Sequence, residues 1–391
     1  MRTKNLFVNR YFWVFLISSI VIVSVFTPIG IILRKRKTPI IIKSNEDFLK
    51  YDLPGTGTEI DPYRIENRRM IINDFVAIMI SNISKFVLIQ NNQINSKSNE
   101  RGIVLGVSIP GLIEIRNNIF ENCLEAIHCI RTYECVIKNN IFKNGKYGIG
   151  AFSFNYANDH LNFLIQNNTF INIENEEIGL LGAGGTIIKD NTCSFNTSEM
   201  QEYDKAYERP VGFLIYNLNG TVIRNNTLAY KGIELIDSDP MNYHSAEVVS
   251  NIVRGKEVGY FLNLNGSNFD ENLYSQLFLI NCTNILVKNQ TSNFTGIGVC
   301  MVNCSNSAIQ DSDFRYNGYA GIYISESNFI TVNNNYFDSN YRGLRTLNSF
   351  NITVSNNSFN NGRYGCEFVN STYILLINTF SGNEVDIRDV D

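Results

Sequence analysis

The chain has 391 residues, with 33 basic and 37 acidic side chains and a formal net charge of −4. Eight of the basic residues precede Glu46, the first acidic residue, which leaves 25 basic against 37 acidic residues and a formal charge of about −12 for residues 44–391. Because phosphate binding requires a basic surface, this distribution argues against a nucleic-acid partner.

A short basic tail, residues 1–10, is followed by an uncharged apolar run from Tyr11 to Leu33. In a helix that rises 1.5 Å per residue this run spans roughly 34 Å, enough to cross a bilayer core. A cleaved signal peptide is the alternative, but the run is too long and no small-residue cleavage pattern follows it. The sequence therefore predicts a transmembrane helix, or signal anchor, over residues 11–33, and a basic linker over 34–43.

Residues 44–66 have the pattern of a cap. Ser44 and Asn45 are typical of a helix N-terminus, and the short amphipathic stretch after them ends in a Gly-rich turn. Since the first unit of a stacked β-structure would otherwise expose strand edges, we expect this segment to cover it.

Residues 67–391 contain a recurring motif, NNxF or a close variant, every 21 to 28 residues for most of their length. A fixed period in this range indicates stacked units. Alternating β-branched residues precede the motif, as in Leu112–Ile115, and a short apolar run opened by Gly follows it, as in Tyr147–Phe152. We therefore predict an all-β, right-handed parallel β-helix of about 12 or 13 coils with three short strands per coil.

Two positions of the motif have a structural reason to recur. The second Asn is expected to adopt the left-handed bend between strands and to bond its amide to the equivalent Asn of the next coil. The last residue is expected to point inward and to stack. The predicted ladder is Asn92, Asn118, Asn140, Asn168, Asn191, Asn226, Asn251, Asn335, Asn357 and Asn378. The predicted stacks are Phe120, Phe142 and Phe170, and Phe314, Phe337, Phe359 and Phe380, with Cys193 as a small core filler.

One pair of cysteines is a disulfide candidate. Cys282 and Cys304 lie 22 residues apart in the matching phrases NCTN and NCSN, so they belong to one column on neighbouring coils. Neighbouring strands bring Cα atoms to about 4.8 Å, within disulfide range. Two buried thiols in a small-residue column are the equal alternative. The remaining cysteines considered, all expected in the core or its stacks, are Cys123, Cys129, Cys135 and Cys366.

The segments Ser44–Asn67 and Arg254–Asn284, with the repeats after Ile285, resemble the NosD-like branch of right-handed parallel β-helix proteins, in the pectate-lyase-like superfamily. The resemblance spans roughly residues 44–385. It implies kinship with carbohydrate-binding and sugar-hydrolysing β-helices, and, through NosD, with copper-site assembly. Copper sites require clusters of His, Met or Cys. Here the Met residues are dispersed and there are only three His, at positions 128, 160 and 244.

The best local concentration of catalytic residue types is the phrase DSDPMNYH, which contains Asp237, Asp239 and His244. Residues i and i+2 share a strand face, and glycoside hydrolysis needs two carboxylates roughly 5 to 10 Å apart. The alternative is a turn, because Asp, Ser and Pro are turn residues.

A second acidic concentration lies in the insertion over residues 197–209. Loops of this kind carry binding functions in solenoids, whereas a solvated acidic loop is the alternative. No cofactor is predicted, but calcium, if bound at all, would be sought here. The candidate binding residues are Glu199, Glu202, Asp204 and Glu208, together with Asp159 and His160.

The surface of the predicted β-helix is rich in Asn, Ser and Thr, and contains NxS/T sequons such as those at Asn219 and Asn265. An Asn ladder generates such sequons by itself, so they favour an extracytoplasmic location only slightly. The sequence leads us to expect a single-pass membrane protein whose β-helix, outside the cytoplasm, binds carbohydrate or a cell-surface polymer without catalysis. The alternatives are a polysaccharide lyase, epimerase or hydrolase, and a metal-delivery accessory protein.

Overall fold

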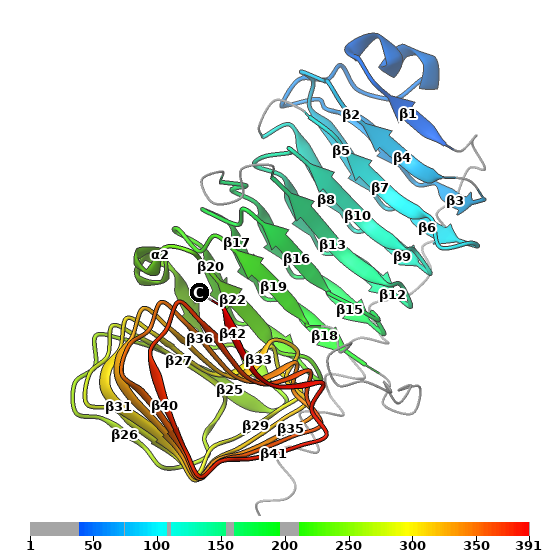
Figure 1. Cartoon of the computed structure of the whole chain (residues 1–391). Helices are drawn as coiled ribbons and strands as arrows, with labels where there is room; N and C mark the ends of the chain where they lie inside the picture. The colour runs from blue at the N-terminus through cyan, green and yellow to red at the C-terminus, as the bar shows by residue number, and fades with distance from the viewer. Residues whose placement is uncertain (1–38, 74, 108–110, 154–159, 196–210, 391) are drawn as a thin grey trace, which may run out of the picture. The chain divides into compact units, whose positions relative to one another are not determined.

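The computed structural model describes residues 39–73, 75–107, 111–153, 160–195 and 211–390 (Figure 1). The predicted transmembrane helix at 11–33 and the basic tail before it lie outside these residues. Within the described ranges, no helix is long and apolar enough to cross a membrane. The described residues all belong to one compact unit.

The described chain begins with a cap. Strand β1 (Ile40–Ile42) pairs with β4 (Val76–Ile80), and the helix after it, η1 (Asn45–Tyr51), is a 3-10 helix. Phe48 of η1 is 1% exposed, and its ring stacks on Tyr63 with ring centroids 4.3 Å apart. The helical segment expected from the sequence therefore covers the first coil with one aromatic side chain.

The strands between residues 40 and 253 form a first solenoid segment of three parallel sheets, and they follow one another in Figure 1 as the chain winds. Sheet I contains β1, β4, β7 (Arg101–Leu105), β10 (Glu125–Ile130), β13 (Tyr147–Phe152), β16 (Ile178–Leu181), β19 (Phe213–Tyr216) and β22 (Ile233–Ile236). Sheet II contains β2 (Tyr63–Glu66), β5 (Val87–Gln90), β8 (Ile113–Arg116), β11 (Val136–Lys138), β14 (Leu164–Gln166), β17 (Ile187–Lys189), β20 (Val222–Arg224) and β23 (Glu247–Val249). Sheet III begins with β3 (Arg69–Ile72), β6 (Gln93–Ser96), β9 (Ile119–Glu121), β12 (Ile141–Lys143), β15 (Thr169–Ile171), β18 (Thr192–Ser194), β21 (Thr227–Leu228) and β24 (Ile252–Val253).

The chain then reverses. A turn at Gly255, whose φ is +79°, leads from β24 into β25, and these two strands pair antiparallel. From here sheet III continues with β25 (Lys256–Leu262), β27 (Tyr274–Ile280), β30 (Ile297–Val302), β33 (Ala320–Ser325), β36 (Arg342–Leu347), β39 (Tyr364–Val369) and β42 (Val385–Val390). Sheet IV contains β26 (Asn268–Phe269), β28 (Leu286–Lys288), β31 (Ser305–Gln310), β34 (Asn328–Asn333), β37 (Ile352–Ser355) and β40 (Tyr373–Leu376). Sheet V contains β29 (Thr291–Asn293), β32 (Asp313–Arg315), β35 (Tyr336–Asp338), β38 (Ser358–Asn360) and β41 (Thr379–Ser381).

The predicted right-handed parallel β-helix is therefore present, with about 13 turns, but it consists of two segments. Because β25 runs antiparallel to β24, the strand that follows the NNxF motif belongs to sheet I in the first segment and to sheet III in the second. The sequence showed the long coil at 254–284 as a break in the period, but not as a reversal of direction.

The Asn ladder is confirmed, whereas the expected bend position was wrong by one residue. Asn118 and Asn140 are fully buried, and the side-chain amide of Asn118 donates to Oδ1 of Asn140 over 3.0 Å. The left-handed residue is instead the first Asn of each pair, as at Asn117 and Asn139, with φ values of 54° and 56°. The second Asn must direct its side chain inward to bond to the neighbouring coil, so the exposed first Asn supplies the bend.

The aromatic stacks are also confirmed. The rings of Phe120, Phe142 and Phe170 stack with centroid distances of 5.1 and 4.7 Å. In the second segment Phe337 and Phe359 stack at 4.5 Å, flanked by Phe314 and Phe380. Cys193 pairs in register with Phe170 and is 4% exposed, as expected of a small core filler.

The end of the first segment is covered by the second. Sheet III of the second segment contributes outward-facing side chains, among them Phe278, Cys300 and Tyr323, to the same hydrophobic cluster as the core of the first segment. At the edge of β22, the Gln276 side chain pairs with the backbone of Ile233. It accepts a hydrogen bond from the Ile233 N–H and donates one to the Ile233 carbonyl, both over 2.7 Å. The two segments thus share a buried interface with paired backbone groups.

All eight cysteines are free and buried. The residues beside Cys282 and Cys304, Thr283 and Ser305, pair in parallel register, so the two thiols do lie on neighbouring coils as predicted. A hydrogen bond from the Cys304 thiol lowers the pKa of Cys282 to about 6. The disulfide itself stays a prediction.

Candidate functional site

The carboxylates of the DSDP phrase accept backbone hydrogen bonds that stabilise a turn. Asp239 is the N-cap of the short helix α2 (Pro240–Ser245) and accepts a hydrogen bond from the Met241 N–H over 2.9 Å. Asp237 accepts from the backbone N–H groups of Leu218 and Asp239, over 2.6 and 2.9 Å. His244 lies in the last turn of the same helix. These bonds correspond to the turn alternative, although Asp237 also borders a pocket.

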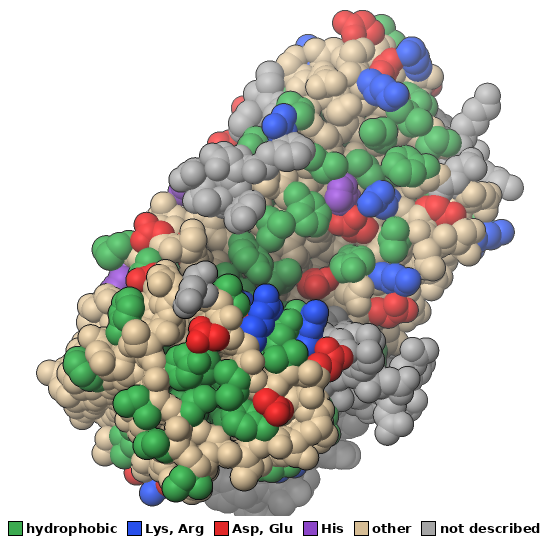
Figure 2. All heavy atoms as spheres, in the orientation of Figure 1, with side chains coloured by type: hydrophobic (Ala, Val, Ile, Leu, Met, Phe, Trp, Pro, Cys, Tyr) green, Lys and Arg blue, Asp and Glu red, His purple; other side chains and the backbone are tan. Residues whose placement is uncertain are grey.

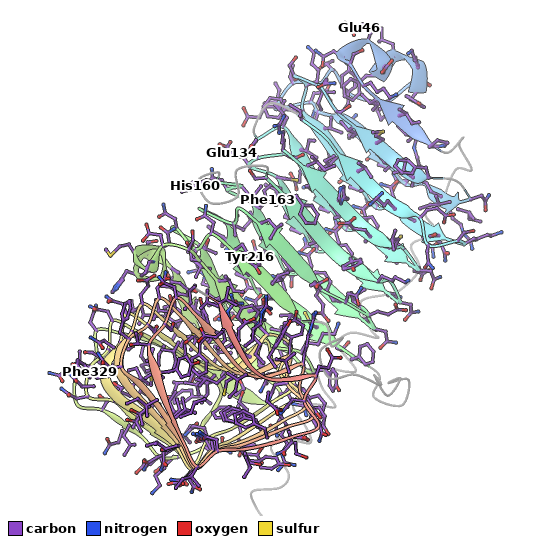
Figure 3. The ribbon with its side chains drawn as sticks, viewed as in Figure 1. Glu46, Glu134, His160, Phe163, Tyr216 and Phe329 are labelled. Carbon is purple, nitrogen blue, oxygen red and sulfur yellow. The ribbon has the colours of Figure 1, made fainter. Side chains whose placement is uncertain are left out.

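The predicted acidic loop, with Glu199, Glu202, Asp204 and Glu208, lies outside the described residues, as does Asp159. His160 is exposed, and its backbone forms an isolated bridge with Ala183. Figure 3 shows it in a turn at the edge of the first segment, whereas Tyr216 lies over sheet I.

The three histidines do not come together. His128 is on β10, His160 precedes β14, and His244 is in α2. Among the described residues, no group of three or more His, Cys, Asp or Glu side chains could hold a metal ion. This donor set does not fit the copper site that the NosD resemblance implies, and we derive no chemistry from it.

The outer face of sheet I carries a groove, visible as a hollow bordered by charged and apolar side chains in Figure 2. It has a volume of about 350 Å³ and extends over β7, β10, β13, β16 and β19. Its lining residues are Arg101, Glu125, His128, Tyr147, Ile149, Gly150, Phe152, Glu176, Gly179, Leu181 and Leu214.

The floor of the groove is lowered by a glycine. His128, Gly150, Gly179 and Leu214 occupy one row across neighbouring strands. A Cβ atom added to Gly179 would meet no atom nearer than 3.9 Å, whereas one added to Gly150 would lie 2.1 Å from Oε1 of Glu125. The Glu125 carboxylate therefore covers Gly150, and the floor is lowest at Gly179, between that carboxylate and the side chain of Leu214 on the next strand.

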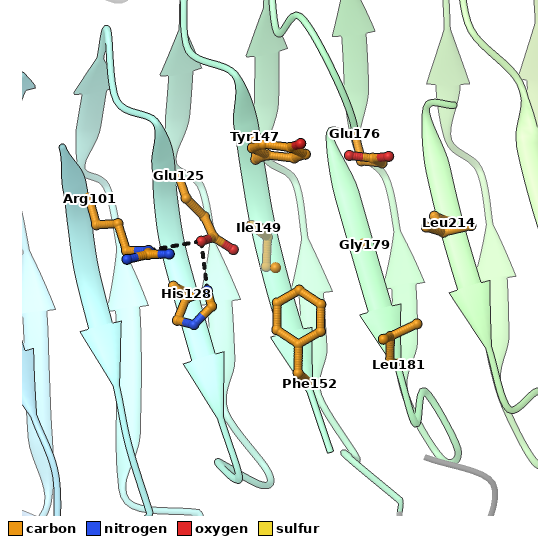
Figure 4. A pocket seen from close by; sticks show the side chains of 11 residues that line it. Arg101, Glu125, His128, Tyr147, Ile149, Phe152, Glu176, Gly179, Leu181 and Leu214 are labelled. Atoms are coloured by element: carbon orange, nitrogen blue, oxygen red, sulfur yellow. Dashed lines mark hydrogen bonds and ion pairs between the residues drawn. The ribbon is translucent and has the colours of Figure 1, made fainter. Parts of the chain in front are cut away.

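Aromatic side chains stand on both sides of this floor (Figure 4). Tyr147 lies at the amino-terminal end of β13 and Phe152 at its carboxyl-terminal end, and they are 37% and 38% exposed. Glu176 lies on the side of Tyr147, and Leu181 on the side of Phe152. An exposed aromatic on each rim gives the groove two apolar faces with polar groups between them.

A charged cluster occupies one end of the groove. Oε2 of Glu125 lies 2.6 Å from Nδ1 of His128 and 3.2 Å from Nε of Arg101, the two contacts dashed in Figure 4. At the other side, burial raises the pKa of Glu176. The groove thus brings together an ion-paired carboxylate and a second carboxyl group whose pKa is raised by burial.

Two parts of this groove were named from the sequence, but neither as a groove: His128 was counted among the three histidines weighed for copper, and the run Tyr147–Phe152 was interpreted only as a strand. The available signal was a glycine inside each of two strands, Gly150 in β13 and Gly179 in β16, because an isolated Gly inside a strand often marks the close approach of another group. Glu125 and Glu176 gave no signal, since charged residues at strand starts are common in any solenoid.

The sequence matches one family model, and several solved structures show a distant likeness. Residues 262–385 match the family described as right handed beta helix region. The A-module of the mannuronan C-5 epimerase AlgE6 of Azotobacter vinelandii is similar over 83% of this chain and 87% of its own, with 12% identity and a TM-score of 0.32. The surface adhesin PfbA of Streptococcus pneumoniae is similar over 90% of this chain and 100% of its own, with 12% identity and a TM-score of 0.27. Tailspike protein 3 of bacteriophage CBA120 is similar over 92% of this chain and 53% of its own, with 11% identity and a TM-score of 0.28.

None of the curated proteins matches this sequence. The structural likenesses concern the fold and say nothing about activity. The parallel sheets, the inward stacks, the Asn ladder and the match over residues 262–385 agree with one another. The chain is a right-handed parallel β-helix protein.

Proposed function

We propose that this protein binds an extended carbohydrate in the groove on the outer face of sheet I, without cleaving it. The observation that carries this proposal is the open floor at Gly179, beside the Glu125 carboxylate that covers Gly150, with the exposed rings of Tyr147 and Phe152 on either side. A sugar ring presents apolar C–H faces to aromatic side chains and hydroxyl groups to polar ones. A concave site with aromatic walls and a few convergent polar groups suits such a ligand.

The polar groups of the groove suit hydroxyls. The Glu125 carboxylate can accept hydrogen bonds from two hydroxyl groups while it remains paired with Arg101 and His128. Glu176, when protonated, can both donate and accept. The strands cross beneath the floor, so a ligand lying along the row of His128, Gly150, Gly179 and Leu214 runs from coil to coil, parallel to the direction in which the coils stack.

We further propose that residues 11–33 hold the protein in a membrane with the β-helix on the extracytoplasmic side, where glycans are available. The support is the length and apolar character of this segment. Protease treatment of intact cells that express the full chain tests the orientation. We expect the β-helix to be cleaved without cell lysis, and full protection of the β-helix would exclude the extracytoplasmic orientation.

The binding proposal is tested with the full chain and a panel of polysaccharides, by co-sedimentation with insoluble glycans and titration with soluble ones. Gly179→Leu fills the open floor without backbone strain, and we expect it to abolish binding. Thr331→Leu, at an outward position of β34 in sheet IV, is the matched control and should bind as the parent does. Binding that survives Gly179→Leu would place the ligand elsewhere.

A second function, cleavage or epimerisation of a polysaccharide, is favoured by one observation: Glu176 and the Glu125–His128 pair line the same groove. A carboxyl group with a raised pKa suits a general acid, and an ion-paired carboxylate suits a base or nucleophile. If the protein is an enzyme, these residues rather than Asp237 and Asp239 are the candidates. The release of reducing ends or unsaturated products by the parent, lost in Glu176→Gln, would establish it; bound but intact glycan would support binding alone.

A further inference from the structure

A second pocket lies where the two solenoid segments meet. Its volume is about 430 Å³. The first segment contributes Tyr216, Asn217, Ile236, Asp237 and Ser238, and the second contributes Tyr319, Tyr323, Arg342, Arg345 and Leu347. We propose that this pocket binds a hydroxylated, single-ring ligand that carries one oxyanion, a carboxylate or a phosphate ester.

The charges around the pocket are not balanced. Glu367, 3% exposed, forms ion pairs with three guanidinium groups, those of Arg342, Arg345 and Arg388. Of these groups only Arg342 and Arg345 line the pocket, and the one carboxylate that lines it is Asp237. Two positive charges at the pocket wall therefore face one negative charge, while Glu367 behind them is shared with Arg388. One bound oxyanion would neutralise the excess, and a partly buried charge is stabilised most when it is paired.

Glu234 does not serve as the missing counter-charge. It is 4% exposed at the edge of sheet I, and burial raises its pKa to about 8, against the opposing effect of Arg342 and Arg345. Glu176, Tyr216 and Tyr319 are further titratable groups that interact electrostatically with Glu234. At neutral pH the carboxyl group of Glu234 is mostly protonated, so the guanidinium groups keep their excess.

Tyrosines hold the guanidinium groups in place. Arg345 Nη1 donates to the hydroxyl of Tyr319 over 2.6 Å, and Arg342 lies 4.4 Å from the ring centroid of Tyr341 and 5.0 Å from that of Tyr319. The side chains of Arg342 and Arg345 are only 11% and 19% exposed. A preorganised, poorly hydrated guanidinium loses little entropy and little hydration on binding a carboxylate or phosphate.

The opposite wall suits hydroxyl groups. Asp237 and Ser238 come from the turn before α2, and Asn217 comes from the residue after β19. Together with the ring of Tyr216, whose pKa burial raises to about 12, they offer acceptors, donors and an apolar face. An oxyanion at the arginine wall and hydroxyls at the Asp237 wall define the ligand.

The test uses the full chain and isothermal titration with three probes: glucuronate, glucose 6-phosphate and glucose. We expect at least one anion to bind about tenfold or more tightly than glucose. Binding of glucuronate alone identifies a carboxylate ligand, and binding of glucose 6-phosphate alone a phosphate ester. No binding of either anion, or equal binding of all three probes, would overturn the proposal.

Two variants address the pocket by different means. Arg345→Gln removes one positive charge but leaves Glu367 paired with Arg342 and Arg388, and should weaken anion binding about tenfold or more. Ser238→Trp covers the pocket from the exposed turn without removing a buried charge, and should abolish binding. If both variants retain the full affinity of the parent, the anion binds elsewhere.

Two controls separate this site from the groove. Arg315→Gln, on β32, removes a surface cation paired with Asp313 and should leave anion binding unchanged. Gly179→Leu should also leave it unchanged while it abolishes polysaccharide binding in the groove. Loss of anion binding in Gly179→Leu would overturn the assignment to the junction, whereas failure of the polysaccharide test alone leaves it intact.

Discussion

Neighbouring residues of the Asn pair at 117 and 118 perform different tasks, and substitution should separate them. The side chain of Asn118 takes part in five hydrogen bonds in the ladder. It donates to the carbonyls of Ile89 and Arg116 and to Oδ1 of Asn140, and it accepts from the backbone and side-chain N–H groups of Asn92, all over 2.9 to 3.0 Å. Asn117 is exposed and left-handed, with φ at 54°.

Asn118→Ala removes all five bonds and leaves the buried N–H groups of Asn92 without that acceptor. A net contribution of about 1 kcal/mol for each hydrogen bond sets a ceiling near 5 kcal/mol, and partial relaxation reduces it, so we expect a loss of about 3–5 kcal/mol. Asn118→Asp should be at least as damaging at neutral pH, because it directs a carboxylate oxygen at two carbonyls. Asn117→Gly should change stability by less than about 0.5 kcal/mol, whereas Asn117→Val should cost about 1–2 kcal/mol in left-handed strain.

Urea unfolding of the full chain, followed by far-UV circular dichroism, measures these differences. Hydrogen exchange of the Asn92 amide, which donates to Asn118, supplies a local readout that should accelerate in Asn118→Ala. The reasoning fails if Asn118→Ala costs less than about 1 kcal/mol and the Asn92 amide keeps its protection. It also fails if Asn117→Gly is as damaging as Asn118→Ala.

Three further outcomes are expected. The pKa of Glu234 in the folded protein, about 8, lies above the ordinary value of 4.5 for a glutamate, so its stabilising contribution is complete below about pH 4.5 and is lost as the pH rises through 8. Glu234→Gln should therefore gain on the order of a few kcal/mol in unfolding free energy over the parent at pH 9. An equal difference between variant and parent at pH 4 and pH 9 would contradict this. Asp239→Ala removes the N-cap of α2 and should cost about 1 kcal/mol in thermal or urea unfolding, whereas Asp239→Asn should be tolerated. Mild oxidation should join Cys282 to Cys304, detectable by mass spectrometry of peptides; oxidised protein in which both thiols still alkylate would exclude the bridge.

The candidate sites show where sequence reasoning reached its limit. Asp237 and Asp239 stood out as a catalytic pair, yet their nearest partners are backbone N–H groups of their own turn and of Leu218. Glu125, His128 and Glu176 did not stand out, because they lie in different coils and come together only when those coils stack. Sequence proximity was therefore a poor guide to a site that is formed across strands.

The sequence by itself determined the repeating unit: the coil length, the buried Asn column and the aromatic stacks. In a solenoid each of these residues contacts its own equivalent one coil away, so the sequence spacing alone identifies the two partners. Asn118 with Asn140 and Phe142 with Phe170 are examples. Only the tertiary structure decided the reversal at Gly255, the groove over Gly179 and the arginine pocket against Tyr216. These depend on which different residues meet across coils and segments, and a repeat pattern contains no information about contacts between unlike positions.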